Sequence, residues 1–233
     1  MIQKLLLLCI VVIFSQAREI PSENQVQGRL NIINGSSTEC VMHHFYTNSG
    51  WMQIEGEVGR NGIDGLYYKK QNGIIREVLV AESKWNKSRL GLSGKRKTIK
   101  QMSQKWVLAT LDKLIKKMHT GIYPTIRNFV SHNQYRARLF RMKPIGKSSI
   151  QITIFRIKNK GLNAFDEIQD TQLSPIDINA PKNAFENGIV ESYNSCRRTY
   201  MKKYLDVLND REIDRLLRNN QLKRDDVLKE IRD

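Results

Sequence analysis

The residues best suited to chemistry lie near the middle of the chain, where VLVAESKW (78–85) carries charged side chains at the end of an apolar run. Side chains alternate faces along a β-strand, so Glu82 and Lys84 are expected to point to one side and Ser83 to the other. A carboxylate and an ammonium at the end of a buried strand are costly unless they pair or bind something. The stretch therefore predicts an ion pair or a binding site.

A second carboxylate is expected next to Glu82. Asp64 stands in GIDG (62–65), upstream of the turn sequence QNG (71–73). Because Asn-Gly supports the positive φ angles of a tight reversal, the two flanking strands should form a hairpin. In that hairpin Asp64 can lie beside Glu82.

Two neighbouring carboxylates repel each other, and a divalent cation relieves that repulsion. With Asp64 and Glu82 as ligands, Mg²⁺ or Mn²⁺ would polarise a phosphoryl oxygen and lower the pKa of a bound water. Lys84 could then steady a negatively charged transition state. The trio predicts metal-assisted hydrolysis of a phosphodiester, and the alternative is a surface hairpin with an ordinary ion pair.

The elements around these residues predict an α/β core with a helical C-terminal part. Val78 to Ala81 form a continuous apolar run, as in a strand buried on both faces. After Thr98 the apolar residues recur at helical spacing. We expect helices over 38–49, 98–118, 125–142, 191–207, 210–218 and 223–231, strands over 51–58, 62–70, 74–85 and 148–158, and a loop over 161–190.

The N-terminus has the layout of a secretory signal peptide over residues 1–17. One basic residue, Lys4, precedes a short apolar run, and a small-x-small pattern closes the segment. An uncleaved anchor or a buried core helix is the alternative. Residues 18–37 are polar and are expected to be a linker. The layout predicts a secreted or periplasmic protein without a stable membrane anchor after cleavage.

Removal of the leader leaves Cys40 and Cys196. An exported protein meets an oxidising compartment, so the two can pair. Sequence alone does not place two thiols within bonding distance, and two free cysteines are an equal alternative.

The formal net charge of +16 is large for 233 residues and suits a polyanionic partner, such as nucleic acid or an anionic surface. A basic protein kept in solution by its charge is the alternative. The stretch SGKRKTIK (93–100), near the start of the predicted helix 98–118, is rich in cations that could grip phosphates, although a solvated charge run is equally consistent. These candidate phosphate-binding residues are Lys95, Arg96, Lys97 and Lys100.

GIDG, the hairpin and the E-x-K of residues 82–84 together resemble the PD-(D/E)XK, or restriction-endonuclease-like, nuclease superfamily. The wider stretch from Gly59 to Trp85, followed by KQMSQKWV (100–107), is similar to nuclease toxin domains of bacterial polymorphic and contact-dependent toxins. The resemblance covers residues 38–118. This sequence lacks the proline that names the motif, and Ile63 takes its place.

The resemblance implies a restriction-endonuclease-like core of helix, mixed sheet with a central hairpin, and helix over residues 38–160, followed by a loop and helical region over 161–233. It also implies a metal-dependent nuclease, for which DNA is favoured over RNA as the expected substrate, and a toxin of this kind can require a neutralising immunity protein. The implied roles are metal ligands for Asp64 and Glu82, the catalytic lysine for Lys84, an additional acidic residue for Glu39 and a catalytic glutamine for Gln101.

Two departures affect the last two roles. Glu55 and Glu57 compete with Glu39, and Lys105 replaces the tyrosine that follows the glutamine in some branches of the superfamily. A non-catalytic basic binding protein and a metal-dependent hydrolase acting on another ester are the competing functions.

Overall fold

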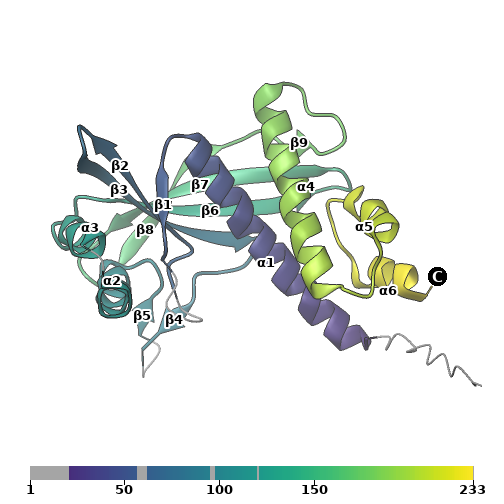
Figure 1. Cartoon of the computed structure of the whole chain (residues 1–233), viewed down its shortest axis with the longest axis horizontal. Coiled ribbons are helices and arrows are strands. Elements are labelled where there is room, and N and C mark those ends of the chain that lie inside the picture. Colours follow the sequence, from purple (N-terminus) through teal and green to yellow (C-terminus); the bar gives the residue numbers. More distant parts are fainter. Residues whose placement is uncertain (1–20, 57–61, 95–97, 120, 233) are drawn as a thin grey trace, which may run out of the picture.

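The computed structural model describes residues 21–56, 62–94, 98–119 and 121–232. In this part six helices flank a mixed, mostly antiparallel sheet (Figure 1). The signal-peptide segment 1–17 lies outside the described residues. The helices are α1 (Glu23–Asn48), α2 (Gln104–Met118), α3 (Ile122–Ser131), α4 (Ala184–Tyr204), α5 (Asp210–Leu217) and α6 (Arg224–Arg232).

The main sheet has the strand order β1-β2-β3-β6-β7-β8, and β9 pairs with β7. All neighbours are antiparallel except β3 and β6, which run parallel. Two short strands, β4 (Leu92–Ser93) and β5 (Ile99–Lys100), form a separate ribbon. The main strands are β1 (Met52–Ile54), β2 (Gly65–Gln71), β3 (Ile74–Trp85), β6 (Arg136–Ile145), β7 (Ser149–Asn159), β8 (Phe165–Gln172) and β9 (Ile176–Asp177).

The central hairpin is confirmed. β2 and β3 are joined by Asn72 and Gly73, whose φ angles of 52° and 77° are the left-handed values expected of an Asn-Gly turn. The apolar run at the middle of β3 is buried on both faces, as predicted. Strand β7 is confirmed as well, and α4, α5 and α6 are close to the predicted C-terminal helices, although α4 begins at Ala184.

The linker expected over 18–37 is wrong for residues 23–37, which belong to α1. Ser22 begins the helix by accepting a hydrogen bond from the Gln25 backbone N–H, and the Gln25 side chain accepts one in return. Apolar residues recur at helical spacing and pack against α4, α5 and α6; they are Val26, Leu30 and Ile33.

The helix expected over 125–142 is also wrong in its second half. Asn133, at a φ of 56°, follows the end of α3, and the chain then enters β6, parallel to β3. Leu139 faces the α2–α3 side and Phe140 the α1–α4 side, so β6 contributes to both cores. The loop expected over 161–190 contains β8, a largely exposed edge strand, and β9.

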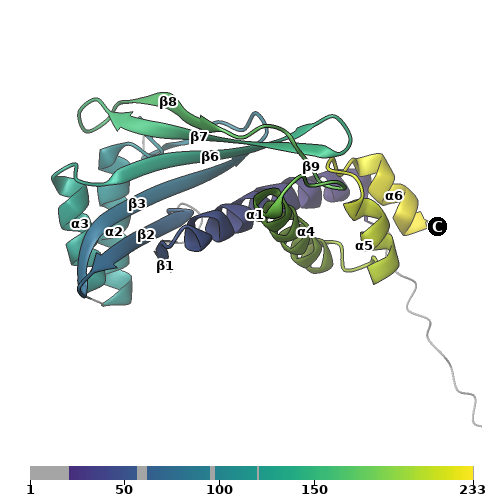
Figure 2. The same cartoon turned by 90° about the horizontal axis from the view of Figure 1, so that it is seen from above.

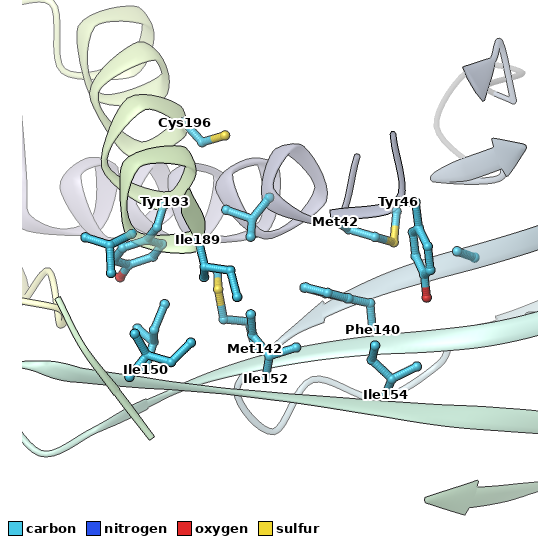
Figure 3. Packing of buried hydrophobic residues seen from close by; sticks show 14 of the residues in the cluster. Met42, Tyr46, Phe140, Met142, Ile150, Ile152, Ile154, Ile189, Tyr193 and Cys196 are labelled. Atoms are coloured by element: carbon cyan, nitrogen blue, oxygen red, sulfur yellow. The ribbon is translucent and has the colours of Figure 1, made fainter. Parts of the chain in front are cut away.

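Two apolar layers enclose the sheet. One lies under α2 and α3, and the other is formed with α1 and α4 (Figure 2). Figure 3 shows the second layer, in which side chains of the two helices point toward those of the sheet. Residues labelled there include Met42 and Tyr46 of α1, Ile189 and Tyr193 of α4, and Phe140, Met142 and Ile152 of the sheet.

Cys40 and Cys196 form a disulfide with a Cα–Cα distance of 5.9 Å, which joins α1 to α4. The structure thus selects one of the two alternatives that the sequence left open. Disulfides are typical of oxidising compartments. Within the described residues, no helix is both long and apolar enough to cross a membrane.

Candidate functional site

The site lies where β2 begins and β3 ends. The strand register pairs Gly65 with Ala81, so Asp64, directly before β2, comes opposite Glu82 as predicted. The Oδ2 atom of Asp64 accepts hydrogen bonds from the backbone N–H and the hydroxyl of Ser83, each at 2.9 Å. These two bonds fix the orientation of the Asp64 carboxylate.

Glu82 is almost fully buried, with 1% of its surface exposed. Its Oε1 atom accepts hydrogen bonds from Lys84 Nζ, at 2.7 Å, and from Gln101 Nε2. Its Oε2 atom is buried and has no hydrogen-bond partner among the described residues. Burial raises the pKa of Glu82 well above its usual range; the charge of Asp64 adds to the rise, and the ammonium of Lys84 opposes it.

Gln101 reaches the site from a turn rather than from a helix. The helix expected from residue 98 begins at Gln104, because Met102 has a φ of 71° and Ser103 caps α2. The Gln101 Oε1 atom accepts the Gly91 N–H at 3.0 Å, which holds the amide so that its Nε2 faces Glu82. Gln101 therefore lies beside the Glu82 carboxylate, as its implied role requires, but on the turn before α2 instead of in the helix.

Glu39 lies on α1 and borders the site from the other side. Together with Asp64 it lines two neighbouring hollows, with volumes of about 670 and 380 Å³. The Glu39 carboxylate is 3.5 Å from Nε2 of His43, whose Nδ1 is 2.6 Å from the buried Tyr67 hydroxyl. Of the two alternatives to Glu39 as the additional acidic residue, Glu55 lines the smaller hollow and Glu57 lies outside the described residues.

Of the four candidate phosphate-binding cations, only Lys100 lies within the described residues. Residues 95–97, with Lys95, Arg96 and Lys97, lie outside the described residues. Lys100, on β5, forms an ion pair with Glu167 at 3.5 Å and lies 4.1 Å from the ring centre of Phe165. Its role toward phosphate remains a prediction.

Two contacts around the candidate site were not expected from the sequence. Ser83 was expected to point away from Glu82, yet its backbone N–H and its hydroxyl both bond the Asp64 carboxylate, which lies directly before β2. His43 is not among the site residues expected from the sequence. Its position four residues after Glu39, on one helical face, was the available signal for the pair.

The carboxylate pair fits a hard divalent cation. Mg²⁺ is usually bound through one or two carboxylates, with water and substrate phosphate as further ligands, and Asp64 and Glu82 supply that number. The Oε2 atom of Glu82, which has no hydrogen-bond partner among the described residues, is an acceptor of the required kind. A second group, Cys40, His44 and Cys196, is close enough for a metal, but its two sulfur atoms are bonded to each other and offer no thiolate.

Chemically, the site combines two acidic groups, an ammonium and an oriented amide at the end of a buried strand. Lys84, with 16% of its side chain exposed, can reach both Glu82 and the larger hollow. Such a set can bind a cation and a negatively charged ester together. Comparisons with protein-family models, with curated proteins and with solved structures gave no match to this chain.

Proposed function

We propose that the mature chain is an exported metal-dependent nuclease that hydrolyses phosphodiester bonds, with DNA as the first candidate substrate. The observation that carries the proposal is the buried Glu82 carboxylate, which lies beside Asp64 and keeps one oxygen without a partner among the described residues. A buried carboxylate in this state is costly unless a proton or a cation compensates it.

Each residue has a distinct role in this proposal. Asp64 and Glu82 would hold Mg²⁺ or Mn²⁺, which when bound supplies a Lewis acid and a more acidic water. Ser83 orients Asp64, and Gln101 orients Glu82 through its Oε1 atom. Lys84 places a positive charge at the mouth of the site, where it stabilises negative charge developing on the phosphoryl group.

The order of the elements supports a more specific fold assignment than a mixed sheet flanked by helices. We propose a restriction-endonuclease-like core, in which α1 precedes the antiparallel β1, β2 and β3, and the helices α2 and α3 lead to β6, parallel to β3. The arrangement corresponds to the helix, mixed sheet with central hairpin, and helix that the sequence resemblance implies. It sets the carboxylates at the end of the central hairpin.

Charge and compartment agree with the proposal. The net charge of +16 favours a polyanionic substrate, and the Cys40–Cys196 disulfide is of the kind that forms outside the reducing cytosol. A toxin effector paired with a neutralising immunity protein and a scavenging enzyme are both compatible with export.

The test is a cleavage assay on the mature chain from Arg18, with plasmid DNA and total RNA, in Mg²⁺ or in a chelator. Glu82→Gln should abolish cleavage, whereas Glu77→Gln, a matched change in a surface ion pair on the same strand, should not. Cleavage that survives Glu82→Gln would refute the mechanism. Absence of cleavage by all three proteins, with salt-sensitive binding retained, would favour a non-catalytic binding protein.

A further inference from the structure

A polar groove extends from the carboxylates along α1. This groove is the larger of the two hollows that meet at Glu39 and Asp64, with a volume of about 670 Å³. One wall comes from α1, and the other from the end of β3 and the loop after it. The lining residues that matter here are Asn31, Gly35 and Ser36 on α1, and Lys84, Trp85, Ser88 and Arg89 opposite.

The α1 wall is straight and open. Its groove-lining residues run from Asn31 to Glu39, which corresponds to about 12 Å of helix at about 1.5 Å per residue. Gly35 lies midway along this wall, and a Cβ atom there would meet nothing within 4 Å. The absent side chain at Gly35 therefore leaves room in the groove, and a bulky one would occupy it.

The opposite wall is held in place by Arg141. Its guanidinium donates hydrogen bonds to the backbone carbonyls of Asn86, at 2.7 Å, and Ser88, at 2.9 Å. The Asn86 N–H is also bonded to the Met142 carbonyl, which ties the loop to β6. The loop thus presents Arg89, an exposed guanidinium with no ion pair in the part of the chain that the structure describes.

The composition of the groove selects its ligand. Lys84 and Arg89 supply positive charge for phosphates, and the carboxylates of Glu39 and Asp64 lie at the end where the metal would bind. Neutral hydrogen-bonding groups come from Asn31 and Ser88, and an aromatic ring from Trp85. Neutral groups and rings contact base edges and faces, which a nucleic acid offers freely only where it is unpaired. A volume of this size holds a drug-sized ligand, which is roughly two nucleotides of one strand.

We propose that this groove binds a single strand of nucleic acid and leads it to the carboxylates, an inference that rests on the proposed function for its choice of ligand. Arg89 contacts a backbone phosphate. The unpaired strand runs along α1 past Gly35 and reaches Lys84 and Asp64 at the end of the groove.

The test is fluorescence anisotropy with a labelled single-stranded oligonucleotide of about 12 nucleotides and with its blunt duplex, in a chelator so that nothing is cleaved. We expect tighter binding of the single strand. Arg89→Gln should weaken it about five- to tenfold and lower the salt dependence by about one phosphate contact. Gly35→Phe should weaken it by about tenfold or more, because the ring fills the groove.

Matched controls are available for both variants. Arg76→Gln removes the same charge from an exposed site near the hairpin end of β3. Gly28→Phe adds the same ring to an exposed glycine of α1 that does not line the groove, where a Cβ again meets nothing. Both controls should bind as the wild type does. Gly35→Phe tests the path of the strand without changing any charge.

Two results would overturn the proposal: Arg89→Gln and Gly35→Phe binding as tightly as their controls, or the duplex binding as tightly as the single strand. The proposed function fails separately. If the wild type bound the strand through these residues but did not cleave it after Mg²⁺ was added, the groove would stand and the nuclease assignment would be refuted.

Discussion

The Cys40–Cys196 disulfide gives a prediction whose magnitude follows from the chain itself. The two cysteines are 156 residues apart. In the chain-entropy treatment, a cross-link that closes a loop of that length lowers the entropy of the unfolded chain and so raises the free energy of unfolding by about 5 kcal/mol. Measured effects of native disulfides fall between about 2 and 5 kcal/mol. We therefore expect the double variant Cys40→Ser/Cys196→Ser to lose about 2–5 kcal/mol of unfolding free energy.

The same loss corresponds to a fall in Tm of about 4–20 °C for a chain of this size. α1 and α4 also share buried apolar side chains with the sheet, so the double variant should still fold. The assay is urea denaturation of the wild type and the double variant, each with and without dithiothreitol. Reductant should lower the wild type to the level of the variant and leave the variant unchanged. Equal stability of oxidised wild type and double variant would refute the reasoning.

Three further predictions concern stability. Burial raises the pKa of Glu82, so without metal the folded state holds a proton that the unfolded state releases, and stability falls as the pH rises from the ordinary carboxyl range toward the raised pKa. Glu82→Gln should remove this fall. In chelator, the Tm of the variant should therefore rise relative to that of the wild type as the pH increases above the ordinary carboxyl range of about 4–5, and parallel curves of Tm against pH would contradict this. The Arg197 guanidinium is fully buried over the Tyr193 ring, without a hydrogen-bond partner among the described residues, and burial lowers its pKa. Arg197→Met should raise the unfolding free energy by about 1–4 kcal/mol in chemical denaturation, and a loss would show that the charge is compensated. Gly28→Ala, on an exposed position of α1, should add about 0.5–1 kcal/mol in the same assay, and a decrease would show that the position is not helical in solution.

Local sequence signals were sufficient to predict the central hairpin of the fold. The Asn-Gly pair specifies the turn, and the apolar run before Glu82 specifies a strand buried on both faces, so the proximity of Asp64 to Glu82 follows from hairpin register. These features depend on residues close together in the chain.

The elements that were predicted wrongly are those whose packing or pairing partners are far away in the sequence. The first half of α1 is polar, and its few apolar residues gain their burial from helices near the C-terminus. β6 carries arginines that resemble a basic helix face, and it becomes a strand by pairing with β3, more than 50 residues earlier.

The same reason limits prediction of the site. The bonds from Ser83 to Asp64, the contact of His43 with Tyr67 and the disulfide all join separate elements. Gln101 was placed near the carboxylates by resemblance, and the turn that delivers it was not foreseen.

The measurement that tests the central claim most directly is the change in thermal stability of the mature chain on adding Mn²⁺. If Asp64 and Glu82 form a divalent-cation site, Mn²⁺ at about 100 times its Kd should stabilise the wild type by about 2.7 kcal/mol, or about 5–10 °C in Tm. Glu77→Gln should respond as the wild type does, and Asp64→Asn and Glu82→Gln should not. An equal response in all four proteins, or none in the wild type, would contradict the account.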